Sequence, residues 1–145
     1  MILISHRGNI TGKNIERENS PEYIRKALNN GFHVELDIWY QDGWFLGHDQ
    51  PQYEINFNFL TNPKFWCHAK NKEAFLKLKQ NKSINCFWHD KDTYTLTSYG
   101  YIWCNINAPL IKNSICVMPE LGINGDINKC SGICSDTIVN YTTNG

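Results

Sequence analysis

Two carboxylates stand two residues apart in the otherwise apolar run HVELDIWY, at 33–40. In a β-strand, residues two apart share a face, so Glu35 and Asp37 lie side by side while the apolar residues face the other way. Neighbouring carboxylates repel each other, and a hard divalent cation such as Mg²⁺ or Ca²⁺ relieves that repulsion through oxygen ligands. Taken alone, the pattern fits a half-exposed strand with a solvated charged face at least as well.

Histidines stand at the ends of two other apolar runs. His6 and Arg7 follow the first run, ILIS, and His48 ends the run WFLGH that comes after an Asp-Gly turn. Histidine titrates near neutral pH and can accept a proton in one step and donate it in the next. Histidines thus follow both the first strand and the strand that comes after the paired carboxylates.

Five short motifs occur in a fixed order: HRG, EN, ExD, DG and HD, all between residues 4 and 49. This ordered set resembles the glycerophosphodiester phosphodiesterase family, and more loosely the spider-venom phospholipase D enzymes of the same fold. The resemblance continues weakly at 68–70 and 132–136 and is poor over 84–130. It implies metal-assisted cleavage of a small phosphodiester, because such an anion needs a cation on its non-bridging oxygens and a proton for its leaving group.

The resemblance implies four catalytic residues. His6 corresponds to the histidine that acts as nucleophile or general base, and His48 to the histidine that protonates the leaving alkoxide. Arg7 is expected to contact or orient the phosphate. Lys70 corresponds to a lysine that supports the phosphate and the metal site.

The implied metal site departs from the family pattern at its third ligand. Glu35 and Asp37 correspond to two ligands for Mg²⁺ or Ca²⁺, but His68 stands where the family has an acid. Both ions prefer oxygen, so this change affects metal affinity or metal choice. Glu120, at the end of the run SICVMPE, and Asp49 are the alternative sources of the missing carboxylate.

Three residues are assigned to substrate binding: Glu18, His68 and Trp103. Glu18 alternatively orients the neighbouring arginine or caps the following helix, and Trp103 alternatively packs in the core. His33 begins its strand at the end opposite the site, so we expect it to be structural. His89 and Asp90 either line the mouth of the site or begin a polar loop.

Strands are predicted at eight short apolar runs by their length and residue types. The runs cover 2–5, 33–40, 44–48, 64–70, 84–90, 100–106, 114–120 and 132–139. One helix is predicted from Pro21, capped by Ser20, to Gly31, and a second from about Lys72 to Gln80. The segment 123–131 is rich in Gly and Asn and predicts a loop.

The order strand, helix, strand at the start predicts a parallel βαβ unit. With the family resemblance, this predicts an α/β fold, a reduced (β/α)₈ TIM-type barrel of the phosphodiesterase kind with several helices shortened or missing, in a single domain over 1–145. Such barrels typically need ~250 residues, so the wall is expected to be incomplete. Exposed apolar strand faces then predict either self-association into a homo-oligomer or loops that cover them.

Charge and cysteine content limit the partners and the compartment. Lys+Arg and Asp+Glu are both 14, so no overall field favours nucleic acid or a membrane surface. No apolar run approaches the ~20 residues of a transmembrane helix, and the start of the chain does not predict a signal peptide. The six cysteines mostly lie in apolar runs, which predicts buried thiols and a cytoplasmic protein.

Two classes of function fit these features. The first is a metal-dependent phosphodiesterase that acts on a glycerophosphodiester or a lysophospholipid-like substrate. The second is a non-catalytic module that binds phosphate and metal, favoured by His68 and by the short wall. The two histidines favour the enzyme, because binding alone does not require an acid–base pair. The motif matches could instead be accidental on a plain α/β domain.

Overall fold

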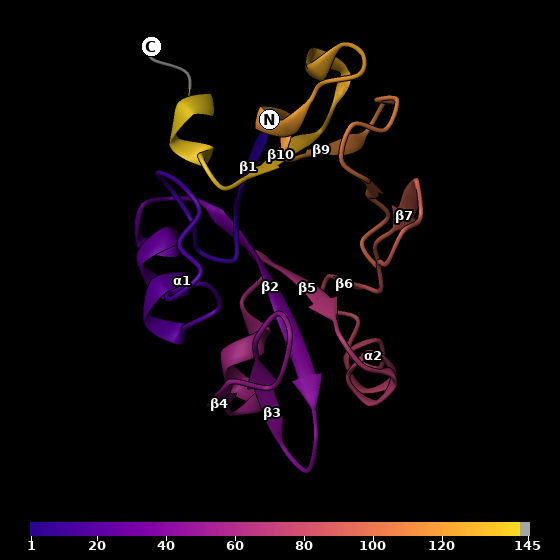
Figure 1. The fold of residues 1–145 in the computed structure, drawn as a ribbon. Coiled ribbons are helices and arrows are strands. Elements are labelled where there is room, and N and C mark those ends of the chain that lie inside the picture. Colours follow the sequence, from indigo (N-terminus) through magenta and orange to yellow (C-terminus); the bar gives the residue numbers. More distant parts are fainter. Residues whose placement is uncertain (143–145) are drawn as a thin grey trace.

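The computed structural model describes residues 1–142, which contain ten strands and two α-helices (Figure 1). The strands are β1 Ile2–His6, β2 His33–Tyr40, β3 Trp44–Leu46, β4 Tyr53–Ile55, β5 Phe65–Ala69, β6 Cys86–Phe87, β7 Tyr94–Leu96, β8 Ile102–Cys104, β9 Ser114–Val117 and β10 Gly132–Ser135. The α-helices are α1 Pro21–Asn29 and α2 Lys72–Leu78. Four short 3₁₀ helices are η1 Phe57–Thr61, η2 Pro119–Leu121, η3 Ile127–Lys129 and η4 Ile138–Tyr141.

Parallel strands form most of the sheet, in the order β6-β5-β2-β1-β10-β9-β8. Their carboxyl ends therefore meet at one edge of the sheet. The hairpin of β3 and β4 pairs antiparallel with the second half of β2, beyond the end of β1, and β7 pairs antiparallel with β8. In Figure 1 the strands follow one another along an arc, with α1 and α2 outside it.

Within the described residues, β6 and β8 do not pair directly, and Ser98 lies between them. The Cys86 amide donates to Ser98 Oγ at 2.8 Å, and the Ser98 amide donates back to the Cys86 carbonyl at 2.9 Å. These two hydrogen bonds give the Cys86 backbone partners on the side of β6 where no strand pairs. The segment after β7 thus links the two ends of the parallel series.

The expected (β/α)₈ TIM-type barrel is wrong. Residues 1–142 form mainly a mixed β-sheet with two α-helices, both of them before residue 79. The physical reason lies in the later connections, which are too short or too rich in turns for crossover helices. The antiparallel β7 occupies the connection after β6, and only one-turn 3₁₀ helices stand between β9 and β10.

Local chemistry explains the two helices that do form, and both predictions are confirmed. Ser20 Oγ accepts a hydrogen bond from the Tyr23 amide, and Pro21 occupies the first turn of α1. Asn71 Oδ1 caps α2 by accepting from the Ala74 amide at 3.1 Å. The strands β1 and β2, which α1 connects, pair in parallel as predicted, and the antiparallel β4 and β7 were not predicted.

The outer face of β2 and β5 packs against the two helices. Val34, Leu36 and Ile38 of β2 are fully buried there, as the strand pattern predicts. On the outer face of β9 and β10, Ile138 of η4 packs with Cys116 and Ile133, so a short turn covers what a helix covers elsewhere. Loops thus cover an apolar strand face, one of the two outcomes predicted for a chain with few helices.

The inner face of the sheet carries an aromatic cluster. Trp66, Phe87 and Trp103 are almost fully buried there, and the ring centroids of Phe87 and Trp103 lie 4.7 Å apart. All six cysteines are buried and unpaired, which confirms the prediction of buried thiols. None of the helices in the described part of the chain is long and apolar enough to cross a membrane.

Candidate functional site

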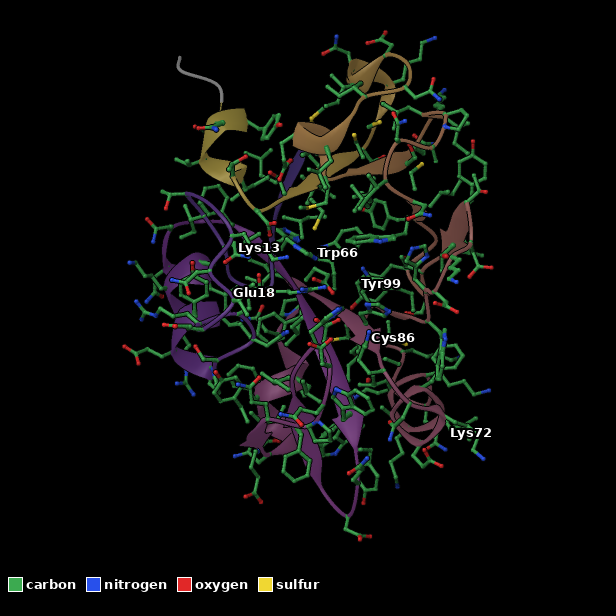
Figure 2. All side chains as sticks on the ribbon, viewed as in Figure 1. Lys13, Glu18, Trp66, Lys72, Cys86 and Tyr99 are labelled. Atoms are coloured by element: carbon green, nitrogen blue, oxygen red, sulfur yellow. The ribbon has the colours of Figure 1, made fainter. Side chains whose placement is uncertain are left out.

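The candidate site lies at the carboxyl ends of the parallel strands, on the inner face of the sheet. Glu35 and Asp37 alternate with the apolar residues of β2, and the register pairs Asp37 with His68 on β5. In Figure 2, Trp66, which the register pairs with Glu35, lies toward the middle of the arc of strands, whereas Lys72 points away from it. The alternation read from the sequence thus places both carboxylates inside the arc.

Three side chains from β2 and β5 form a compact group of possible metal ligands. One ligand atom from each of Glu35, Asp37 and His68 lies within 4.8 Å of the other two. His68 Nδ1 is 3.1 Å from Asp37 Oδ1 and 3.6 Å from Glu35 Oε1. Burial lowers the pKa of His68, but the two carboxylates outweigh that effect and raise it to about 9.

The second nitrogen of His68 is already fixed. His68 Nε2 lies 2.9 Å from the carbonyl oxygen of His89, so it donates its proton there and Nδ1 faces the carboxylates. A metal-binding histidine typically gives its other N–H to a carbonyl or carboxylate in this way, which fixes the tautomer and the orientation of the ring. The imidazole is therefore oriented as a ligand.

The carboxylate oxygens of this group fit a divalent cation. Glu35 Oε2 and Asp37 Oδ1 are buried, and their neighbours His6 Nε2 at 3.7 Å and His68 Nδ1 at 3.1 Å do not form hydrogen bonds of good geometry with them. A buried carboxylate oxygen without a partner is costly, and a bound cation removes that cost. The two carboxylates suit a hard cation such as Mg²⁺ or Ca²⁺, whereas the added imidazole favours Mn²⁺ or another first-row transition ion.

Arg7 stands between two acids beside this group. Its Nη1 donates to Glu18 Oε2 at 3.0 Å, and its Nε lies 3.1 Å from Asp37 Oδ2. Asn19 donates to the same Asp37 oxygen at 2.9 Å. Burial raises the pKa of Asp37, but His48, His68 and Arg7 hold it well below its usual range, so Asp37 is a carboxylate at neutral pH.

His6, the last residue of β1, is held by an acid from the neighbouring strand. Its Nδ1 lies 2.7 Å from Asp136 Oδ1, and Asn9 donates to the same oxygen at 2.8 Å. His6 Nε2 faces Glu35 Oε2 at 3.7 Å. Burial lowers the pKa of His6, but the Asp136 bond and the Glu35 charge outweigh that effect and raise it.

The hairpin of β2 and β3 brings His48 to the same place. Its Nδ1 is 3.5 Å from Asp37 Oδ2, and its Nε2 is 3.4 Å from Arg7 Nη2. The turn before it depends on Gly47, because a Cβ there would collide with the backbone oxygen of Gln50. Trp39 Nε1 fixes this turn by donating to the Gly47 carbonyl at 2.7 Å.

A cavity of about 570 Å³ joins these side chains. His6, Arg7 and His48 line it together with Glu35 and His68. Its volume lies within the range of sites for small molecules. Both histidines, the arginine and two members of the metal-ligand group, Glu35 and His68, thus face one space, although they come from four different segments of the chain.

Three of the six non-glycine residues with positive φ among the described residues lie at this site. Arg7, Asn19 and Met118 all have positive φ, at 58°, 64° and 53°. Each such residue outside glycine costs on the order of 1 kcal/mol, and strain of this kind clusters at functional sites. At Arg7 the unusual backbone directs the side chain back across the end of β2, toward Asp37.

The structure places the other predicted residues in different ways. Lys70 and Trp103 line the cavity, as do His89 and Asp90, but Trp103 is 4 % exposed and belongs mainly to the aromatic cluster. Glu18 pairs with the arginine, one of the two roles given as alternatives to substrate binding. His33 accepts from Trp66 Nε1 at 3.1 Å at the opposite end of β2, in agreement with a structural role.

The two alternative carboxylates lie outside the metal-ligand group. β9 ends at Val117, and the left-handed Met118 followed by η2 turns Glu120 away. Its carboxylate instead accepts from Ser135 Oγ and from the Asp136 amide. Asp49 is 93 % exposed in its side chain and lies 3.6 Å from His48 Nε2.

Sequence reasoning missed the role of the residues that support this site. Asp136 fixes His6, Asn19 holds Asp37 through two hydrogen bonds, and Asn9 links Asp136 to Glu18. The available signal was the position of Asp136 at the end of the last strand. A strand that pairs with β1 brings an acid there beside a histidine at the end of β1.

Comparisons with models of protein families, with curated proteins and with solved structures find no match for this chain.

Proposed function

We propose that this protein is a divalent-metal-dependent phosphodiesterase that acts on a glycerophosphodiester or lysophospholipid-like substrate. The observation that carries the proposal is the convergence of His6, Arg7 and His48 on one cavity beside the group of Glu35, Asp37 and His68. The ordered motifs that resemble glycerophosphodiester phosphodiesterases support it, because their residues are the ones that converge.

Asp136 prepares His6 to act as a general base. By accepting the Nδ1 proton, it leaves Nε2 as the proton acceptor, on the side that faces the cavity. An acid in this position also stabilises the imidazolium that forms when the base takes a proton. His6 can thus take the proton of an attacking hydroxyl, either from the substrate itself or from water.

His48 is placed to act as the general acid. It is less buried than His6, with 41 % of its side chain exposed, and its Nε2 lies within reach of both Arg7 and the cavity. Arg7 is fixed by Glu18 and Asp37, so its remaining N–H groups can bind a phosphate oxygen without reorganising. A bound phosphate then lies between the two histidines.

The reaction needs positive charge where the phosphorus centre gains negative charge. A divalent cation held by Glu35, Asp37 and His68 would supply it when bound. Lys70, which also lines the cavity, adds a second cation from this chain. In the family-type reaction, the hydroxyl next to the phosphate attacks, so that a cyclic phosphate forms and the second alcohol leaves with the proton of His48.

The test is release of alcohol from glycerophosphocholine and from lysophosphatidylcholine, with and without Mg²⁺, Mn²⁺ or Ca²⁺. We expect cation-dependent turnover that falls by about 10²–10⁴-fold in His6→Ala and in His48→Ala. The matched control is His33→Gln, a histidine change at the opposite end of the sheet. Unchanged turnover in both site variants would falsify the assignment.

The alternative function, a non-catalytic module that binds metal and phosphate, is favoured by one observation. His68 replaces the acid that the family pattern has at that position. Calorimetry with a divalent cation and with glycerol 3-phosphate separates the two functions. Binding of the phosphate without any turnover of diesters identifies the module.

A further inference from the structure

Glu120, which lies outside the metal-ligand group, contacts the end of β10. It belongs to η2, which follows β9, and β10 lies between β1 and β9 in the sheet (Figure 1). Glu120 Oε1 accepts one hydrogen bond from Ser135 Oγ at 2.9 Å and another from the Asp136 amide at 3.0 Å. One side chain thus holds two consecutive residues at the point where β10 ends.

The turn that carries Glu120 is fixed to β10 by its own backbone. The Met118 amide donates to the Cys134 carbonyl at 2.7 Å, so the chain is still joined to β10 where η2 begins. Met118 then adopts a left-handed backbone, with φ of 53°, and the Leu121 amide donates to the Met118 carbonyl at 2.9 Å. Such a backbone is costly at a residue other than glycine, and here it directs Glu120 toward β10.

Asp136 is held at its backbone and at its side chain by different residues. Glu120 accepts from its amide, whereas its Oδ1 accepts from Asn9 Nδ2 at 2.8 Å and lies 2.7 Å from His6 Nδ1. Only two side-chain torsions separate the backbone of an aspartate from its carboxylate, so the backbone position decides which atoms the carboxylate can reach. The contact to Glu120 therefore bears on the contact to His6.

We propose that Glu120 is a positioning residue for His6 and that it acts through Asp136. The inference rests on the proposed phosphodiesterase function. Glu120 holds the amide of Asp136, and the Asp136 carboxylate holds the Nδ1 proton of His6. The Nε2 atom of His6 is therefore the proton acceptor on the side of the cavity. Glu120 is not part of the cavity lining and contacts no reacting atom.

The position of the acceptor oxygen, and not the charge of the carboxylate, carries this role. The hydrogen bonds from Ser135 Oγ and from the Asp136 amide both end on Glu120 Oε1. The amide oxygen of a glutamine has two lone pairs and can accept both bonds without a charge. An aspartate keeps the charge, but it is shorter by one methylene and withdraws its carboxylate from the two donors. The two substitutions thus separate geometry from charge at one position.

Steady-state kinetics with glycerophosphocholine and a divalent cation compare Glu120→Ala, Glu120→Asp and Glu120→Gln with the wild type. We expect kcat to fall by about 10–10²-fold in the alanine and aspartate variants, since a small misplacement of a catalytic group costs this much. KM should stay unchanged, because Arg7 and the metal-ligand group are untouched. The glutamine variant should keep the kcat of the wild type. Unchanged kcat in all three variants, or an equal loss in the glutamine variant, overturns the inference.

Nuclear magnetic resonance of the ring nitrogens tests the positioning without any turnover. Isotope-labelled histidine is used in the metal-free protein, at a pH where the His6 ring is neutral, and His6→Gln assigns the signals. The proton should lie on Nδ1 in the wild type and in Glu120→Gln, and move partly to Nε2 in Glu120→Ala and Glu120→Asp. Glu54→Ala, the loss of an exposed carboxylate on β4, is the matched control and should behave like the wild type.

The two measurements separate this inference from the proposed function. A proton that leaves Nδ1 of His6 in the alanine and aspartate variants only, without turnover of any diester by the wild type, supports the connection from Glu120 to His6 and refutes the enzyme. Turnover that is equal in the wild type and in all three variants leaves the phosphodiesterase in place and overturns the positioning role. A lower melting temperature with unchanged kcat and an unchanged proton position overturns it too, because the contact is then merely structural. Far-ultraviolet circular dichroism verifies that each variant is folded.

Discussion

The two ends of β2 differ in whether their buried polar groups have hydrogen-bond partners within the protein. At the amino end, His33 accepts a hydrogen bond from Trp66 and so has a partner within the protein. At the carboxyl end, the buried atoms Arg7 Nε, Glu35 Oε2, Asp37 Oδ1 and His48 Nδ1 lie 3.1–3.7 Å from acidic or basic side-chain atoms but form no hydrogen bond of good geometry with the described residues. The same strand thus carries a completed polar contact at one end and an incomplete set at the other.

This difference distinguishes a polar contact that stabilises the fold from polar groups that remain available to a ligand. A buried polar group costs free energy unless it has a partner, so a stable fold pairs most of them internally. Four buried atoms without a well-formed hydrogen bond in one place, next to positive-φ backbone at Arg7 and Asn19, are the arrangement expected where a bound ligand completes the contacts. A cation and a phosphate supply the two kinds of partner that these atoms lack.

The largest effect is expected from Asp37→Asn. Asp37 is fully buried and contacts Arg7, Asn19, His48 and His68, so it organises the whole carboxyl end. Loss of its charge should weaken Mg²⁺ or Mn²⁺ binding more than about 100-fold, since outer-sphere partners alone are worth 10–100-fold. Calorimetric titration with the metal measures this.

Asp42→Asn is the control for that variant, because it makes the same change in the exposed turn of the β2–β3 hairpin. We expect it to bind metal like the wild type. If Asp37→Asn also keeps the affinity of the wild type, the incomplete end of β2 is not a metal site. The comparison between the two ends then loses its functional meaning.

The sequence was sufficient to predict much of the carboxyl end of β2. The alternation in HVELDIWY predicted that Glu35 and Asp37 share a face, and the Asp-Gly turn predicted the return of the chain to His48. Such features depend on local geometry, which the period of a strand determines. For His68 the sequence left both substrate contact and a third metal ligand open, and its hydrogen bond to His89, with Nδ1 facing the carboxylates, favours the ligand role.

Features that depend on distant segments were not predicted correctly. The (β/α)₈ barrel was expected from the front of the chain, but the later connections hold β7 and 3₁₀ turns instead of helices. Glu120 was expected at the metal because its strand was predicted to extend to 120, whereas Met118 and Pro119 end it earlier. Strand ends are set by turns, and apolar periodicity carries little information about them.

The second-largest effect is expected from Asp136→Asn, which tests whether Asp136 orients His6 and raises its pKa. The amide still accepts the Nδ1 proton but brings no charge, so we expect turnover to fall by about 10–10³-fold while metal affinity stays nearly unchanged. The Asp136 charge helps to raise the pKa of His6. Its loss lowers that pKa, and the acidic limb of the profile of kcat/KM against pH should move to lower pH.

A merely structural role for Asp136 would lower the fraction of folded enzyme without moving the limb. Asp92→Asn, at an exposed position before β7, should leave both turnover and the limb unchanged. An acidic limb that stays in place in Asp136→Asn contradicts the role of this carboxylate in preparing His6.

The pH dependence of metal binding is a smaller and more gradual effect. Without metal, the pKa of His68 is raised from 6.5 to about 9, so its protonated form stabilises the fold below pH 6.5 and this contribution is lost as pH rises to about 9. A metal ligand must be deprotonated, so metal affinity should rise by up to about tenfold for each pH unit in this window.

Melting curves measured from pH 6.5 to 9, with and without Mn²⁺, test this expectation. The metal-free protein should lose stability across the window, and the added cation should stabilise it more at high pH than at low pH. His68→Gln removes both trends. A metal-induced shift in melting temperature that is independent of pH would show that His68 Nδ1 is not a ligand.

The smallest effect is expected at the other end of β2, from His33→Gln. The glutamine side chain can still accept the Trp66 N–H, so we expect a loss of about 1 kcal/mol or less in the free energy of unfolding, the net value of one hydrogen bond. Burial, followed by the charge of Lys64, lowers the pKa of His33, so the neutral ring is the form being replaced. Metal affinity and turnover should stay at the level of the wild type, since His33 lies at the end of β2 opposite the site. Urea unfolding and steady-state kinetics measure the two quantities, and a drop in turnover without a drop in stability would mean that both ends of the strand serve the site.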